Sequence, residues 1–164
     1  MNRIGNGIDV HRFAADRPLV LGGVRIADRG GLEGHSDADA VLHALVDAML
    51  GAVGAGDIGE YFPSSDERWR GAASSVFVAE ALRLVGERGF RIVNIDVTVV
   101  AEAPKLGPHK ARMRASVAAM LGVGEDRVNI KATTTDGLGF TGRREGLCAL
   151  ATVLVEAASS PTEG

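Results

Sequence analysis

The sequence has little of several features, and each shortage argues against a class of protein. Cys148 is the only cysteine, so no disulfide can form within the chain. We therefore expect the protein to work in the reducing cytoplasm. No apolar run approaches the roughly 18 residues that span a bilayer, and Met1 leads almost directly into a strand-like segment, so we expect no membrane anchor and no signal peptide. The 18 lysines and arginines form no long basic run and the formal net charge is −3, which argues against a nucleic-acid binder.

Aromatic residues are also scarce, at 4%, whereas there are 22 glycines. Such a chain is rich in tight turns and has few large side chains for its core. The length of 164 residues, with 46% hydrophobic and 24% charged residues, is typical of one globular domain. We expect a single domain over residues 1–158 and a disordered tail at 159–164. Cys148 lies in an apolar run, which favours a small core residue over a nucleophile.

Hydrophobic patterns predict a β-β-α-α-β-α-β-β order of elements. Gly22-Gly23 interrupts the second strand, and Ser36 with Asp39 resembles a capping box that opens the first helix. The predicted strands are Arg3–Arg12, Leu19–Ile26, Arg91–Val100, Val128–Thr134 and Leu147–Val155, and the predicted helices begin at Ser36, Ser74 or Ser75, and Pro108. This order predicts an α/β fold of the α+β type, a two-layer sandwich with helices on one face of a mixed β-sheet.

A histidine-carboxylate set offers a candidate metal site. Asp9 and His11 are two residues apart, so on a strand they share one face, and His43 would approach from the first helix. One carboxylate and two imidazoles suit a zinc site with one position left open. Asp39 and Asp47 lie one helical turn on either side of His43, where a carboxylate would orient the second ring nitrogen. The alternative is a polar pair on a half-exposed strand beside a solvated helix face.

Polar segments follow several of these elements. His35 and Ser36 stand at the predicted helix start, where free N–H groups suit a phosphate. Residues 101–106 and 132–136 leave the ends of strands, where α/β sheets place ligands, and Asp136 would be a hard oxygen ligand for magnesium. Residues 56–66 and 137–143 are also compatible with plain turns, and threonines at 133–135 also favour strands.

Together these segments resemble the 2-C-methyl-D-erythritol 2,4-cyclodiphosphate synthases of the non-mevalonate isoprenoid pathway. The matches run in family order over about residues 2–157. They are Arg3-Ile4-Gly5 with Gly7 and Asp9-Val10-His11, Leu21-Gly22-Gly23-Val24, Gly34-His35-Ser36-Asp37 with His43, Gly56-Asp57-Ile58-Gly59, Asp96-Val97-Thr98, Ala103-Pro104-Lys105, Asn129-Ile130-Lys131-Ala132-Thr133-Thr134 and Phe140-Thr141-Gly142-Arg143.

The resemblance implies roles for individual residues. Asp9, His11 and His43 match zinc ligands, and His35 and Thr134 match catalytic residues that hold and polarise phosphates. Substrate-binding positions are Ser36, Asp57, Gly59, Phe62, Asp66, Ala101, Ala103, Pro104, Lys105, Leu106, Gly107, Ala132, Thr133 and Thr135. Asp136 stands where the family usually has a glutamate that binds magnesium, so Mg²⁺ or Mn²⁺ is the expected second metal.

The resemblance also implies an assembly and a reaction. Three subunits pack their sheets around an axis, with active sites at the subunit interfaces. The 2-phosphate of 4-diphosphocytidyl-2-C-methyl-D-erythritol 2-phosphate attacks the β-phosphorus, the ring closes and CMP leaves. Ile8, Phe140 and Arg143 match the lining of an axial cavity for an isoprenoid diphosphate. Two alternatives are a zinc-dependent phosphohydrolase and a non-catalytic nucleotide-binding oligomer.

Three positions depart from the family pattern. Asp136 is one methylene shorter than the usual glutamate, Ser64-Ser65-Asp66 replaces a more acidic loop, and Ile8 stands where an aromatic is common.

One further expectation concerns the trimer axis. Two predicted strands carry an apolar face, which we expect to meet its copies at that axis because it is too apolar for water. Its residues are Val97, Val99, Ala149, Ala151 and Val153.

Overall fold

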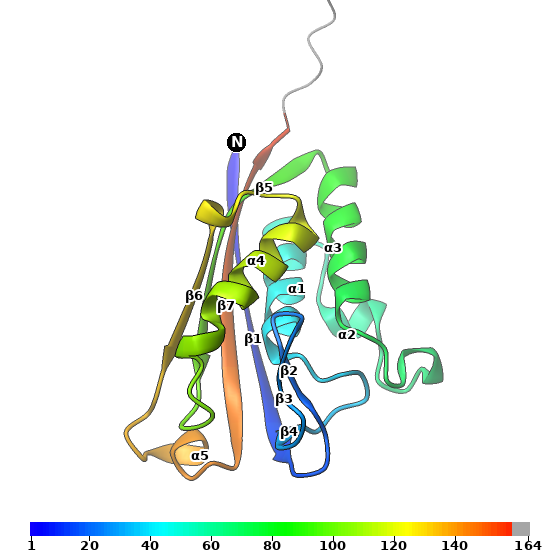
Figure 1. Ribbon diagram of the computed structural model, residues 1–164. Helices are drawn as coiled ribbons and strands as arrows, with labels where there is room; N and C mark the ends of the chain where they lie inside the picture. Colours follow the sequence, from blue (N-terminus) through cyan, green and yellow to red (C-terminus); the bar gives the residue numbers. More distant parts are fainter. Residues whose placement is uncertain (159–164) are drawn as a thin grey trace, which may run out of the picture.

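The computed structural model describes residues 1–158, so the tail predicted at 159–164 lies outside the described residues. A five-stranded sheet has the order β4-β1-β7-β5-β6 (Figure 1). Strand β7 is antiparallel to both β1 and β5, whereas β5 and β6 are parallel. The strands are β1 (Asn2–Ala14), β4 (Gly31–Leu32), β5 (Phe90–Val100), β6 (Val128–Thr133) and β7 (Gly146–Ala157).

Three long helices cover one face of this sheet (Figure 1). They are α1 (Ala40–Ala52), α3 (Ser75–Glu87) and α4 (Lys110–Leu121). The predicted fold, a mixed sheet with helices on one face, is therefore confirmed. The sequence did not predict β4, or the short helices α2 (Ile58–Tyr61), α5 (Gly139–Gly142), η1 (Glu67–Trp69), η2 (Gly107–His109) and η3 (Glu125–Arg127). Among the described residues, no helix is long and apolar enough to cross a membrane.

Two glycines of β1 determine how closely α1 packs on the sheet. A Cβ at Gly5 would lie 1.9 Å from the Ala48 carbonyl oxygen, and one at Gly7 would lie 2.1 Å from that of Ala44. Only glycine allows the helix backbone to approach the strand this closely. Because side chains alternate along a strand, the face that meets α1 is also the face of the next odd-numbered residues of β1. This packing brings the side chains of α1 to that face.

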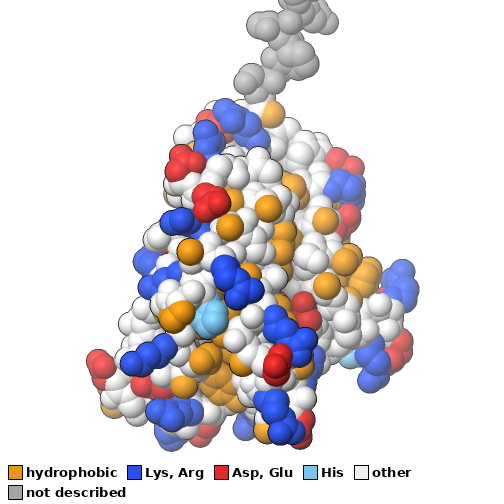
Figure 2. Space-filling view, in the orientation of Figure 1, with side chains coloured by type: hydrophobic (Ala, Val, Ile, Leu, Met, Phe, Trp, Pro, Cys, Tyr) orange, Lys and Arg blue, Asp and Glu red, His pale blue; other side chains and the backbone are white. Residues whose placement is uncertain are grey.

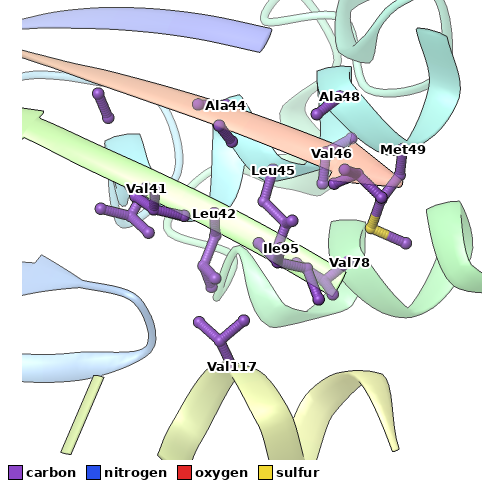
Figure 3. Packing of buried hydrophobic residues seen from close by; sticks show 14 of the residues in the cluster. Val41, Leu42, Ala44, Leu45, Val46, Ala48, Met49, Val78, Ile95 and Val117 are labelled. Carbon is purple, nitrogen blue, oxygen red and sulfur yellow. The ribbon is translucent and has the colours of Figure 1, made fainter. Parts of the chain in front are cut away.

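The core lies between the sheet and the three helices. Figure 3 shows Leu42 and Leu45 of α1 pointing toward Ile95 of β5, Val78 of α3 and Val117 of α4. All five side chains are buried. Hydrophobic side chains are visible along the middle of this view, with charged side chains among them and at the edges (Figure 2).

Two local predictions were wrong near the first helix. Helix α1 begins at Ala40 with Asp39, not Ser36, as its N-cap. The buried Asp39 carboxylate accepts from Leu42 N at 3.0 Å and also from Gly22 N at 2.9 Å and Gly23 N at 2.7 Å. Gly22 and Gly23 have positive φ and form the turn of a hairpin, so the single predicted strand is two short ones, β2 (Leu19–Leu21) and β3 (Val24–Ala27).

The prediction for the apolar strand faces was also wrong. Val97, Val99, Ala149, Ala151 and Val153 are at most 1% exposed, because the helices of the same chain cover them. The other face of the sheet carries Ile4, Ile8, Val10 and Leu150, which are 71%, 60%, 50% and 41% exposed. Strand β7 also carries Leu150 and Leu154 on its open face, so alternation in this strand alone did not show which face the helices cover.

Candidate metal centre and active site

Asp9 and His11 of β1 and His43 of α1 converge in the structure. Asp9 Oδ2 lies 2.8 Å from His11 Nε2 and 3.3 Å from His43 Nδ1, and the two ring nitrogens are 3.3 Å apart. Tetrahedral zinc with bonds of about 2.0–2.1 Å needs ligand atoms ~3.3 Å apart. The predicted set therefore forms a possible metal-binding group of the right size.

The electrostatics of this group also fit a cation. Asp9 Oδ2 is buried and has no hydrogen-bond partner among the described residues, although both imidazoles are close to it. Burial would raise the pKa of Asp9, but the neighbouring imidazoles outweigh it and lower the pKa to about 2. Burial likewise opposes the charged form of His11, yet the Asp9 carboxylate raises the pKa of this imidazole. An ionised oxygen without a donor, flanked by two ring nitrogens, is a donor set that a divalent metal satisfies.

Other groups orient the two imidazoles. His11 Nδ1 lies 2.6 Å from the Glu33 carbonyl oxygen, so it carries a proton and leaves Nε2 free for a metal. His43 Nε2 lies 2.8 Å from Ser74 Oγ and 3.2 Å from Ser36 Oγ. The structure thus supplies a partner for the outer nitrogen of each candidate ligand.

The prediction that Asp39 or Asp47 orients His43 was wrong. Asp39 turns back to cap its own helix, and Asp47 Oδ1 accepts from Ile58 N at 2.8 Å. Residues one turn apart share a helix stripe, but competing backbone donors decide where each carboxylate points. Ser74 and Glu33 were not foreseen in this role, because nothing in their local sequence indicates that they contact a histidine.

His35 lies in the loop before α1, not at the helix start as predicted, because the helix begins later. Its Nε2 is 3.3 Å from the Asp66 carbonyl oxygen. The Arg17 guanidinium donates to the carbonyls of Gly34 and Ser36 on either side of His35, at 2.5 Å for Ser36. Arg17 was not foreseen as a functional residue, and it fixes the loop that presents His35.

The predicted substrate residues after α1 lie around α2 and η1. Asp57 caps α2 by accepting from Glu60 N at 3.2 Å, and Gly59 lies within that helix. Asp57 also lines a hollow of about 490 Å³ with Asp47 and Ile8. Farther along, the Phe62 ring packs 4.4 Å from that of Phe77, and Asp66 caps η1 and pairs with Arg68.

The predicted nucleotide segments meet at the ends of β5 and β6. A hollow of about 350 Å³ is lined by both segments, including Ala101, Pro104, Lys105, Leu106, Gly107, Ala132, Thr133 and Thr134. The two strands are parallel neighbours, so their carboxyl ends lie at the same edge of the sheet. Ala103 precedes Pro104 through a cis peptide bond.

The β6–α5 loop holds the candidate magnesium ligand. Asp136 has a positive φ of 52°, and its Oδ1 accepts from Thr134 Oγ1 at 3.3 Å. Thr135 Oγ1 donates to the Leu138 carbonyl at 2.6 Å. Glu102, which was not foreseen, accepts from the backbone N–H groups of Thr135 and Gly137, both at 3.2 Å, and so ties this loop to the end of β5.

The residues predicted for an axial cavity lie on two parts of the chain. Ile8 is exposed in mid-β1, opposite Leu150. Phe140 lines a hollow of about 240 Å³, which it shares with Val10 rather than Ile8. Arg143 Nε donates to Glu145 Oε1 at 3.0 Å.

The fold and the site define an α/β protein with a candidate metal centre where α1 crosses β1. Comparison with known proteins gives its family. A model described as the YgbB family matches residues 2–156, and the chain belongs to this family. The chain is similar to 2-C-methyl-D-erythritol 2,4-cyclodiphosphate synthase of Bordetella avium, 53% identical over 93% of this chain and 94% of that protein. The resemblance found in the sequence is therefore confirmed.

Longer relatives are also similar. The bifunctional enzyme IspD/IspF of Erythrobacter litoralis is 52% identical over 97% of this chain, and that of Paramagnetospirillum magneticum is 58% identical over 91% of it. The matches cover 41% and 39% of those proteins, so the chain spans about two fifths of their length.

Solved structures match the fold closely. Bifunctional IspDF of Campylobacter jejuni has a TM-score of 0.93 at 45% identity, covering 96% of this chain and 42% of that one. IspF of Plasmodium falciparum in a CDP complex has a TM-score of 0.84 at 30% identity, covering 96% of this chain and 97% of that one.

Proposed function

We propose that this chain converts 4-diphosphocytidyl-2-C-methyl-D-erythritol 2-phosphate to 2-C-methyl-D-erythritol 2,4-cyclodiphosphate and CMP. The observation that carries the proposal is the convergence of Asp9, His11 and His43. The chain that holds them aligns with nearly the full length of the Bordetella avium 2-C-methyl-D-erythritol 2,4-cyclodiphosphate synthase. The CDP complex of a structural relative supports a cytidine nucleotide as part of the ligand. We further propose that residues 1–158 form one catalytic domain. We also propose a cytoplasmic location, which the single cysteine suits.

The reaction exchanges one phosphorus–oxygen bond for another. An oxygen of the 2-phosphate attacks the β-phosphorus, the bond from that phosphorus to the bridging oxygen breaks, and CMP leaves with that oxygen. No water enters and no protein nucleophile is required, which agrees with the burial of Cys148 in β7. The chain therefore contributes positioning and charge neutralisation.

The proposed roles are those that the family resemblance implies for each residue. The His35 imidazole and the Thr134 hydroxyl would bind phosphate oxygens, with Arg17 holding the loop of His35. Asp57 and Gly59 would bind the hydroxyls of the methylerythritol. The hollow between residues 101–107 and 132–134 would receive the cytidine.

Two metals belong to the proposal. Asp9, His11 and His43 would hold Zn²⁺, which supplies a Lewis acid and a template for the attacked phosphate when bound. Asp136 would hold Mg²⁺ or Mn²⁺ at the diphosphate, where a divalent cation neutralises charge. The shorter Asp136 arm would reach this cation less directly than a glutamate.

We also propose a homotrimer with active sites between subunits. The support is the open sheet face, where Ile4, Ile8, Val10 and Leu150 are exposed in the single chain, since a contiguous apolar surface favours association. Three copies around an axis would also group Ile8, Phe140 and Arg143. An Arg guanidinium suits phosphate oxygens, so we include an isoprenoid diphosphate as a ligand of that axis.

Product analysis tests the proposed reaction. The chain is incubated with the cytidylyl substrate and divalent metal, and CMP, cyclic diphosphate and inorganic phosphate are quantified. The proposal predicts equal amounts of CMP and cyclic diphosphate, without inorganic phosphate. Release of inorganic phosphate would indicate a phosphohydrolase, and binding of CDP without turnover would indicate a nucleotide-binding protein; either result would refute the proposal.

A further inference from the structure

We infer that Ser74 and Asp37 form a hydrogen-bond relay that fixes which ring nitrogen of His43 faces the metal centre. Both are positioning residues: they would act through His43 and touch neither metal nor substrate. The inference rests on the proposed metal site, and it concerns residues for which the sequence suggested no such role.

The contacts form a continuous chain from the imidazole to a carboxylate. His43 Nε2 lies 2.8 Å from Ser74 Oγ, and the Ser74 hydroxyl donates to Asp37 Oδ1. Asp37 also accepts from two backbone groups, Ser74 N at 3.0 Å and Asp39 N at 3.1 Å. Ser74 is fully buried, so water does not compete for its hydroxyl.

The direction of these hydrogen bonds follows from the number of protons available. A carboxylate only accepts, so the proton of the hydrogen bond between Ser74 and Asp37 must come from the Ser74 hydroxyl. The single hydroxyl proton of Ser74 is therefore directed to Asp37, and Ser74 Oγ presents a lone pair to His43. Nε2 of His43 must then carry a proton, and Nδ1 keeps the lone pair that faces Asp9 and His11.

Neighbouring groups are consistent with this direction. Ser36 Oγ, 3.2 Å from His43 Nε2, accepts from Ala38 N and offers a second acceptor to the same ring N–H. Aromatic rings hold the imidazole in place, with centroids at 5.3 Å for His11 and 5.9 Å for Phe77. A ring flip that would exchange the two nitrogens is therefore hindered.

Two variants break the relay at different points. Ser74→Ala removes the acceptor of the Nε2 proton, so His43 is no longer held in one tautomer. Asp37→Ala removes the acceptor of the hydroxyl proton, which then turns toward His43 Nε2 and favours the tautomer protonated at Nδ1. Loss of a group that hydrogen-bonds the outer nitrogen of a metal-bound histidine typically weakens metal affinity by about 10–100-fold. We expect zinc to bind more weakly by that factor in both variants.

The control is Ser75→Ala. Ser75 is the residue next to Ser74 and the first of α3, and it takes no part in the contacts among His43, Ser74 and Asp37. This variant should keep the zinc affinity of the unaltered chain. Circular dichroism and thermal unfolding of the metal-free proteins identify any variant that fails to fold.

The decisive measurements are the His43 tautomer and the zinc dissociation constant. Nitrogen-15 NMR of the metal-free chain, at a pH where imidazole is neutral, should show the His43 proton on Nε2, and chelator competition gives the affinity. A proton on Nδ1 in the unaltered chain would overturn the relay, as would unchanged zinc affinity in a folded Ser74→Ala variant. If the unaltered chain bound no zinc, the proposed metal site would fail, and the tautomer alone would decide the relay.

Discussion

At the scale of single residues, His43 offers a direct test of the candidate metal site. It is the only one of the three candidate ligands that comes from a helix, so it closes the site from the side opposite β1. We expect His43→Ala to lower bound zinc well below one per subunit and to abolish cyclisation. Metal analysis and the product assay measure both effects, and circular dichroism should show an intact fold.

A matched control for this variant is His109→Ala, because His109 lies in η2 and outside the ligand group. It should keep both zinc and activity. Full zinc occupancy in His43→Ala would show that the ion is bound elsewhere.

Asp136 is the proposed ligand of the second metal. Asp136→Asn keeps the shape of the side chain but removes the charge, so we expect more Mg²⁺ to be needed for half-maximal activity while zinc content stays the same. Asp136→Glu should be tolerated, since it lengthens the arm toward the cation. Titrations of activity with Mg²⁺ measure this effect, and an identical metal dependence of Asp136→Asn and the unaltered chain would argue against the role.

The sequence predicted the group of Asp9, His11 and His43, but not the residues that orient its two imidazoles. Spacing on a strand grouped Asp9 with His11, the predicted first helix supplied His43, and the family resemblance then implied the same three residues. Ser74 and Arg17 contact the site only because the tertiary structure brings distant segments together, and no local sequence pattern predicts this. Such contacts join segments distant in sequence, so they become visible only in three dimensions.

At the scale of elements, the Asp39 carboxylate joins the start of α1 to the β2–β3 hairpin, and its ionisation makes stability depend on pH. Burial raises the pKa of Asp39 to about 6, although the backbone N–H groups of Gly23, Leu42 and Gly22 oppose this. The folded state therefore binds more protons than the unfolded state between pH 3.8 and about 6. Stability should fall as the pH rises through this window, by at most about 3 kcal/mol for this group.

Asp39→Asn tests this prediction, because it keeps a side-chain oxygen at the cap and removes the ionisation. Urea unfolding of the metal-free chain at several pH values should show a smaller fall in stability between pH 4 and 6 for the variant. The low pKa of Asp9 acts below this window and does not interfere. Parallel pH profiles for the two proteins would contradict the account of Asp39.

Most long elements could be predicted because their hydrophobic periods are clear. The alternation in β5 and the left-handed Gly122 after α4 are examples. The start of α1 could not, because Ser36 and Asp39 are both good capping residues and tertiary contacts to Gly22 and Gly23 favour the second. The short helices α2 and α5 have too few residues to show a period.

At the scale of the whole molecule, the open face of the sheet is the surface on which the proposed trimer would form. Sequence alternation identified an apolar face, yet the face chosen proved to be the one under the helices. Packing by α1 at Gly5 and Gly7 decides this, and it leaves Ile8 and Leu150 outside. The correction changes which residues a trimer would bury.

We expect the unaltered chain to be a trimer in light scattering and Leu150→Lys to dissociate it, since a charge would then be buried in an apolar interface. Val76→Lys is the matched control, because Val76 is an exposed apolar residue on α3 at the helical face. It should remain a trimer. A monomeric unaltered chain would remove the shared active sites and the axial ligand together.

The central claim is that the Asp9, His11 and His43 group holds a metal required for ring closure. The most direct measurement is the yield of cyclic diphosphate per CMP from the intact chain, after zinc removal by a chelator, and after zinc is restored in excess Mg²⁺. We predict equimolar products at first, loss of both on zinc removal, and recovery with one zinc per subunit. Undiminished cyclisation by verified zinc-free protein, or CMP release without cyclic product, would contradict the account.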